Sequence, residues 1–138
     1  MILGKKKIAN ILSRLGIAEA KKILASIETK NAKLADEIRD LMFSFEDVLN
    51  LSEKDMNEVH QKIDKNDLLL AMKGASDELK EKLLTGMSSR RREMLIEELE
   101  LMGKVKRKDV EAAQQRIADV VRKMIEIGEV SLDDEWVE

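Results

Sequence analysis

Residues 31–47, NAKLADEIRDLMFSFED, decide how the chain is organised. The first part of this stretch carries apolar residues at the spacing of one helix face: Leu34, Ala35, Ile38, Leu41 and Met42. The predicted helix runs directly into MFSF, residues 42–45, which holds both phenylalanines of the chain. Ordinary core packing could explain this pair, but its concentration in one short segment indicates a seam between two subdomains.

Two further helices are predicted before this stretch, one over residues 8–15 that stops at Gly16 and one from Ala18 to about Ile27. The apolar stripe of the first consists of Ile8, Ile11, Leu12 and Leu15. The second is expected to bury Ile23, Leu24 and Ile27. Three short helices in about 42 residues resemble one unit of a helical repeat, which cannot cover its own apolar face. Residues 1–42 are therefore predicted to form a three-helix unit that stacks on a neighbour.

After the seam the sequence predicts six helices, the first of them brief and containing Val48 and Leu49. The starts of the next four are marked by the capping residues Ser52, Asp64 or Asn66, Ser76 and Ser88. Glycines end four of the helices: Gly74, Gly86, Gly103 and Gly128. The last helix is expected to begin near Asp109. We predict an all-α fold with a hinge at residues 43–47, a six-helix domain at 48–130 and an acidic tail at 131–138.

Composition limits the possible functions. The 138 residues include no proline and no cysteine, 43% are hydrophobic and 38% charged, and the net charge is −3. This balance favours helices and gives the whole chain no attraction for nucleic acid or anionic lipid. The longest apolar run, residues 68–72, is too short to cross a membrane, and the basic start at residues 1–7 lacks the apolar stretch of a signal peptide. We therefore expect a cytoplasmic protein.

Catalysis has no support in the sequence. His60 is the only histidine and has no metal-ligand companion at helical spacing, and no glycine-rich phosphate loop occurs. A basic cluster lies at Lys104, Lys106, Arg107 and Lys108. No aromatic side chain accompanies it for base stacking, and an acidic array lies one turn upstream. We predict no enzyme, metal, cofactor, nucleic acid or small-molecule substrate.

The predicted helix over residues 88–102 is the most informative. Its apolar stripe, expected to be buried, is Leu95, Ile96, Leu99 and Met102, and the opposite face carries Arg90, Glu93, Glu97 and Glu100. The three arginines Arg90–Arg92 occupy the first turn and the acids lie near the end, so the charges oppose the helix dipole. A solvated surface is the plain interpretation, but a pattern that stability does not explain indicates a recognition surface.

At these residues the sequence resembles the family of flagellar motor switch proteins called FliG. The resemblance rests on ordered motifs: MFSFED (42–47), LLLAMKGASDELKEKL (68–83), MSSR (87–90), EELELMGKVKRKDVEAAQQ (97–115) and IGEV (127–130). It implies the C-terminal third of that family, with an armadillo-type three-helix unit followed by a six-helix torque domain. The family's N-terminal and middle domains have no counterpart in these residues.

The resemblance also implies a function. The charged helix would face the cytoplasmic loop of the stator subunit MotA, through charges that correspond to Lys73, Arg90, Glu97, Glu98 and Lys106. All five keep the family's sign. The segment Met42, Phe43, Ser44 and Phe45 would be the hinge that reorients the torque domain when rotation reverses. The first unit would stack on a neighbouring FliG middle domain, the switch protein FliM would be a further contact, and the location would be the flagellar basal body at the inner face of the cell membrane.

Four positions depart from the family. Lys104 stands where proline is usual, Ser44 where valine is usual, and Arg91 and Arg92 where alanines are usual. Arg92 projects onto the apolar stripe, so we expect its stem to be covered and its charge to reach solvent. The alternative function is a generic helical adaptor that binds through an apolar groove near Phe43 and Phe45. The isolated chain is expected to be monomeric.

Overall fold

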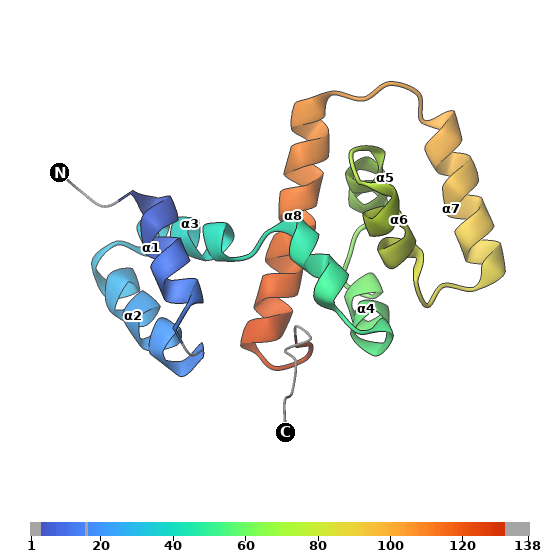
Figure 1. The fold of residues 1–138 in the computed structure, drawn as a ribbon. Helices are drawn as coiled ribbons and strands as arrows, with labels where there is room; N and C mark the ends of the chain where they lie inside the picture. Colours follow the sequence, from blue (N-terminus) through green and yellow to red (C-terminus); the bar gives the residue numbers. More distant parts are fainter. Residues whose placement is uncertain (1–3, 16, 132–138) are drawn as a thin grey trace. The chain divides into compact units, whose positions relative to one another are not determined.

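The structure, a computed structural model, describes residues 4–15 and 17–131 (Figure 1). Over these residues it contains eight α-helices and one 3₁₀ helix and no β-strand, which confirms the all-α prediction. The chain divides into two compact units, one ending at Ser44 and the other starting at Phe45. This boundary lies inside the predicted seam.

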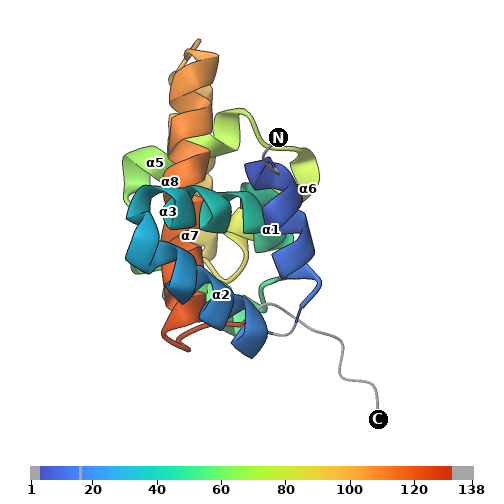
Figure 2. The ribbon, with the colours of Figure 1, turned by 90° about the vertical axis from the view of Figure 1, so that its left-hand side faces the viewer.

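The first unit consists of α1 (Lys5–Ser13), α2 (Ile17–Lys30) and α3 (Ala32–Met42). Helix α3 packs against both α1 and α2 (Figure 2). The core of the unit is formed by Ala9, Leu12, Ala20, Leu24 and Ile38. Asn31 begins α3, because its side-chain oxygen accepts a hydrogen bond from the Leu34 backbone N–H at 3.1 Å.

Ile23, which the sequence predicts to be buried, is exposed, so that prediction is wrong. Ile11, Leu15 and Leu41, which belong to the apolar stripes of α1 and α3, are exposed as well. The reason is geometric: three short helices enclose a small core, and the rest of each wide apolar stripe has no fourth element to cover it within the unit. Stacking of this unit on a neighbour stays a prediction.

The second unit contains the remaining six helices. They are η1, a 3₁₀ helix (Phe45–Asn50), α4 (Glu53–His60), α5 (Lys65–Lys73), α6 (Asp77–Leu84), α7 (Ser89–Leu101) and α8 (Arg107–Glu126). Helix α5 packs against α6, α7 and most extensively α8, and α8 also packs against η1 and α4. A buried core runs through this set and includes Leu51, Met56, Met72, Leu83 and Ile117.

The helix starts follow the predicted capping chemistry. The hydroxyl oxygens of Ser52, Ser76 and Ser88 each accept a hydrogen bond from the backbone N–H three residues later. At α5 the cap is Asp64, not Asn66, because its carboxylate accepts from the N–H of Asn66 at 3.1 Å. Helix α8 begins at Arg107, two residues before the predicted start. The end residues of a helix are the part that sequence predicts least reliably, because the terminal turns fray and alternative capping residues compete there.

The predicted hinge differs in extent. Helix α3 ends at Met42 and η1 already begins at Phe45, so only Phe43 and Ser44 lie between helices. Both phenylalanines are buried. Hinge motion itself stays a prediction. Gly16 and residues 132–138 of the predicted acidic tail lie outside the described residues.

Gly74 explains how α5 approaches α8 so closely. A Cβ atom at Gly74 would lie 2.5 Å from the Cγ1 atom of Val110, well inside van der Waals contact. Beside it, the side-chain amide of Gln114 donates a hydrogen bond to the Ala71 carbonyl at 3.1 Å. The glycine in the KGAS motif therefore allows α5 to pack closely on α8. This packing also fixes the position of Lys73, the last residue of α5.

Candidate binding surface on helix α7

Helix α7 is attached to its unit along a narrow line. Of its residues only Leu95 is buried, at 3% exposure, while Leu99 and the C-capping residue Met102 are half-buried. The prediction that Ile96 is buried is wrong, since it is 38% exposed. Helix α7 packs mainly on the single helix α5, which covers a narrower strip than a full apolar face, and Ile96 lies about 100° around the helix from Leu95.

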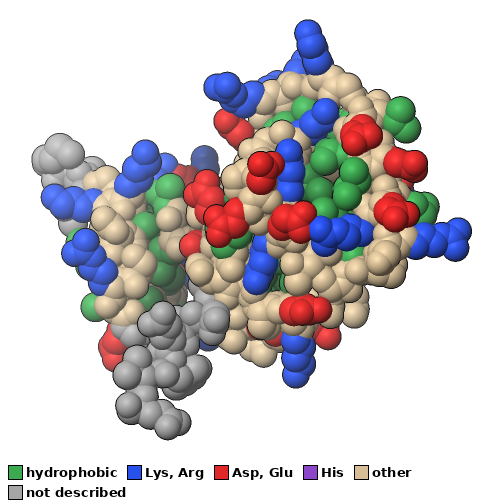
Figure 3. All heavy atoms as spheres, turned by 45° about the vertical axis from the view of Figure 1, so that its right-hand side comes forward, with side chains coloured by type: hydrophobic (Ala, Val, Ile, Leu, Met, Phe, Trp, Pro, Cys, Tyr) green, Lys and Arg blue, Asp and Glu red, His purple; other side chains and the backbone are tan. Residues whose placement is uncertain are grey.

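The charged side of α7 is open to solvent. Arg90, Glu93, Glu97 and Glu100 are all exposed, as the sequence predicts. Arg90 and Glu97 form no ion pair with any residue in the described part of the chain. Figure 3, which brings the α7 side forward, shows acidic, basic and separate hydrophobic side chains projecting there. The side chains are therefore accessible to another molecule.

The order of these charges works against the helix. The first turn of α7 contains no acid and the last turn contains no base. Each misplaced charge costs about 0.3–1 kcal/mol at a weakly screened helix end. Folding alone would favour the reverse order, so helix stability does not explain the arrangement.

Glu98 differs from its neighbour Glu97. Its Oε1 atom lies 2.6 Å from the Nζ atom of Lys65, the first residue of α5. Glu98 is half-buried, whereas Glu97 is exposed. The two adjacent acids that the sequence groups together therefore lie on different sides of the helix, and Glu98 helps hold α7 against α5.

The other two predicted charges lie on neighbouring elements of the same unit. Lys73 is the half-buried last residue of α5. Lys106 is exposed and directly precedes α8. The connection between α7 and α8 passes through Gly103, whose φ of +69° is a left-handed conformation that favours glycine. The five predicted charges thus come from α5, α7 and the start of α8.

Arg92 behaves as its position predicts. It is half-buried, and its Nη2 atom lies 2.5 Å from an oxygen of Glu81 on α6. The stem is covered while the guanidinium reaches a surface partner. This ion pair is the second, after Lys65–Glu98, that joins α7 to the rest of the unit. The sequence alone did not reveal it, because the two residues lie on separate helices.

His60 lies at the end of α4 and is half-buried. Burial lowers the pKa of its imidazole, and the nearby Arg91 guanidinium lowers it further, while the backbone of Leu83 and Thr85 offsets only part of this shift. Leu83 and Thr85 lie near the ring, but among the described residues no group forms a hydrogen bond of normal geometry with either ring nitrogen. His60 is therefore neutral at pH 7 and packs under the turn that leads from α6 into α7.

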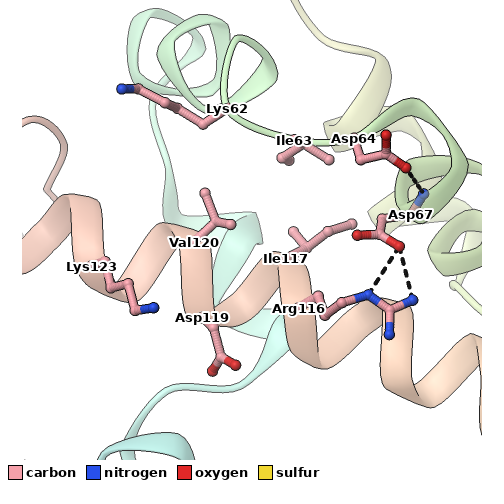
Figure 4. A pocket seen from close by; sticks show the side chains of 9 residues that line it. All are labelled: Lys62, Ile63, Asp64, Asp67, Arg116, Ile117, Asp119, Val120 and Lys123. Carbon is pink, nitrogen blue, oxygen red and sulfur yellow. Dashed lines mark hydrogen bonds and ion pairs between the residues drawn. The ribbon is translucent and has the colours of Figure 1, made fainter.

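A shallow cavity of about 330 Å³ lies between α8 and the α4–α5 connection (Figure 4). Its charges balance, with three cations and three carboxylates among its lining: Lys62, Asp64, Asp67, Arg116, Asp119 and Lys123. Arg116 donates two hydrogen bonds to Asp67, at 3.0 and 2.8 Å, and Asp119 accepts one from Gln115. Because the lining charges balance and Arg116 already pairs with Asp67, the cavity offers a ligand no excess charge of either sign.

Two further features are missing from the described residues. They contain no group of three or more histidine, aspartate or glutamate side chains arranged to hold a metal ion. No helix among them is long and apolar enough to span a membrane.

Together the fold and this surface define an all-helical module with an exposed, charged helix. Residues 25–132 match the family described as the FliG C-terminal domain. The chain belongs to that family, which consists of structural motor switch proteins and not of enzymes.

Comparison with individual proteins gives the same family. The chain is 48% identical to the flagellar motor switch protein FliG of Thermotoga maritima over 127 residues, which cover 92% of this chain and 38% of that protein. It is 40% identical to FliG of Helicobacter pylori, covering 96% and 38%. The structure of full-length FliG from Aquifex aeolicus superposes with a TM-score of 0.85 at 36% identity, covering 93% of this chain and 40% of that one. The chain thus spans about two fifths of the length of the curated relatives it matches.

Proposed function

We propose that this chain is the torque-generating part of a flagellar rotor, acting by electrostatic contact between α7 and a stator subunit. The observation that carries the proposal is the open charged side of α7, where Arg90 and Glu97 are exposed and unpaired among the described residues. Lys73, Glu98 and Lys106 would add further charges to this surface from neighbouring positions.

The mechanism requires no covalent chemistry. Movement of the stator's cytoplasmic loop, the loop of MotA, would bring its charges past Arg90 and then Glu97, so that successive attraction and repulsion step the rotor. Exposed ion pairs are each worth only about 0–1 kcal/mol and are screened by salt. Weak contacts of this kind break as readily as they form, which suits a moving interface.

The first unit supports a role in assembly. Its exposed apolar residues Ile11, Leu15, Ile23 and Leu41 leave a surface that a second helical unit could cover. We propose that a neighbouring FliG middle domain stacks there and that FliM is a further partner. Reorientation about residues 42–45 would switch the direction of rotation, at the inner face of the cell membrane.

The generic adaptor remains the second candidate, but its predicted groove is not supported. Phe43 and Phe45 are both buried, so they offer little apolar surface to a partner. An adaptor would also bind with little dependence on salt, whereas the open charges of α7 predict a strong dependence.

The test is a triple charge reversal, Arg90→Glu with Glu97→Lys and Glu98→Lys, made in the full-length flagellar protein. We expect loss of swimming that exceeds the effect of alanine at any one of these positions. Cysteine cross-linking between position 90 and the stator loop in assembled motors would show the contact directly. Wild-type swimming by the triple variant would overturn the electrostatic mechanism.

A further inference from the structure

The connection between α7 and α8 carries a cluster of positive charge. Four of the five residues from 104 to 108 are basic, and all four are exposed: Lys104, Lys106, Arg107 and Lys108. None of their side chains forms an ion pair or a hydrogen bond with any residue in the described part of the chain. Within residues 101–109 the only acid is Asp109, and the next one, Glu100, lies on α7. The fold therefore leaves this basic cluster largely without counter-charges.

The basic cluster lies at a projecting end of its unit. Figures 1 and 2 show the connection and the start of α8 extending beyond the other helices of the second unit, and Figure 3 shows basic side chains projecting from that end. Leu101, the last residue of α7, is 86% exposed, more than any other large hydrophobic side chain among the described residues. Cations and an exposed apolar side chain therefore occur together at this end.

Stability of α8 does not explain the basic cluster. Lys106, Arg107 and Lys108 stand at the start of the helix, where the helix dipole disfavours positive charge. Lys106 is also the N-capping residue, and its side chain forms no capping hydrogen bond. Folding alone would favour a short polar or acidic residue at these positions.

We infer that the α7–α8 connection contacts an anionic lipid membrane, with its four cations among the headgroups and Leu101 at the boundary of the acyl chains. The inference does not depend on the proposed stator contact. Each cation near an anionic bilayer strengthens binding about fivefold, over a range of about 8–10 Å at physiological salt. The net charge of −3 belongs to the whole chain, whereas charges at the far end of the 20-residue α8, about 30 Å away, are screened.

An acidic protein segment fits this end less well than a membrane does. It could pair with the cations, but a protein interface takes much of its affinity from a packed apolar centre. Leu101 is a single exposed side chain at a projecting end and does not form such a centre. A bilayer is deformable and accepts one apolar side chain between its headgroups. The combination therefore favours a lipid surface.

The first test uses the purified chain with vesicles of pure phosphatidylcholine and with vesicles of phosphatidylcholine and phosphatidylglycerol in equal amounts. We expect the chain to co-sediment with the mixed vesicles only, and to be released at high salt. Arg107→Gln with Lys108→Gln should weaken this binding about ten- to thirtyfold. Lys106 is left unchanged, because it also belongs to the proposed stator-binding charges.

The matched control is Lys54→Gln with Lys62→Gln, which changes the net charge by the same amount. Both lysines are exposed, in α4 and directly after it. Asp55 of α4 accepts a hydrogen bond from the backbone N–H of Ser131 at 3.0 Å, so α4 lies near the other end of α8. We expect this control to bind the mixed vesicles as the unchanged chain does.

A second measurement follows Leu101 itself. The chain has no cysteine, so a Leu101→Cys variant can carry one fluorescent label that is sensitive to its surroundings. We expect its emission to shift to shorter wavelength when mixed vesicles are added. Ile127→Cys is the matched position, since Ile127 is 70% exposed and directly follows α8. Its emission should not change.

Several results would overturn the inference. These are no binding to the mixed vesicles, equal binding to both kinds of vesicle, or an equal loss in the control variant. A label at position 101 that does not respond while the chain binds would place the membrane contact elsewhere. Binding to polyglutamate but not to the vesicles would assign the basic cluster to an acidic protein. Circular dichroism of each variant, compared with the unchanged chain, confirms that its fold is intact.

Discussion

Helices α7 and α8 belong to one unit but use their residues in opposite ways. Helix α8 has 20 residues and buries six of them, Val110, Ala113, Ile117, Ala118, Val121 and Met124. Helix α7 has 13 residues and buries one, Leu95. Since burial of apolar area is the main favourable term in folding, α8 holds the unit together and α7 contributes little to its stability. A helix that adds little to the fold leaves most of its surface available for contact with another molecule.

The sharpest test of this contrast is truncation of one large side chain on each helix. Ile117→Ala in α8 removes a side chain that is 1% exposed, and should lower the free energy of unfolding by about 2–5 kcal/mol. Leu101→Ala in α7 should change it by less than about 0.5 kcal/mol. Urea unfolding of the chain followed by circular dichroism measures both. Equal losses would mean that α7 supports the fold as much as α8 does.

The second test concerns the close approach that seats α5 on α8. Gly74→Ala would bring a Cβ atom against Val110, and we expect it to cost about 1–3 kcal/mol of unfolding free energy because the core must shift. Val110→Ala removes the opposing methyl groups. In a double-mutant cycle the two substitutions together should cost less than the sum of their separate effects. Additive costs would show that the contact is not the cause.

Sequence reasoning predicted the framework of this fold well. Local signals mark helix starts, and Ser52, Ser76 and Ser88 cap the helices as expected. The periodicity of α8 also identified Val110 and Ile117 as core residues, because a helix contacted from several sides buries its whole stripe.

The misses share one cause. Ile23 and Ile96 belong to apolar stripes but are exposed, since the width of the buried strip depends on how many neighbours cover it. The periodicity of apolar residues shows which side of a helix is apolar, but it does not show how many other helices cover that side. For the same reason the sequence could not separate Glu97 from Glu98, because only the position of Lys65 in space distinguishes them.

The third test uses pH and the single histidine, which lies where α4 meets the turn into α7. The pKa of His60 is lowered in the folded state from an ordinary value of 6.5. As pH falls through 6.5 the unfolded chain therefore takes up the proton first, and the free energy of unfolding decreases. The stabilisation is complete above pH 6.5 and is lost progressively below it.

His60→Gln should remove this component. The difference in stability between wild type and variant should be constant from pH 8 to 7 and should change between pH 6.5 and 5.5, in a series of urea titrations. Carboxylates titrate in both proteins and cancel in the comparison. A constant difference over the whole range would show that the imidazole ionises equally in the folded and unfolded states.

The smallest expected effect separates the two sides of α7 itself. Lys65 and Glu98 form an ion pair at the surface, and a double-mutant cycle with Lys65→Met and Glu98→Gln should give a coupling of about 0.2–1 kcal/mol. The matched cycle with Glu97→Gln should give no coupling, because Glu97 faces away from Lys65. The cycle cancels the interaction of each charge with the helix dipole, which single substitutions would include.

In motors the relative importance of the two acids should reverse, with Glu97→Gln reducing torque more than Glu98→Gln. Equal coupling of Lys65 to both acids would remove the distinction between an inner side that holds α7 in place and an outer side that is free to bind.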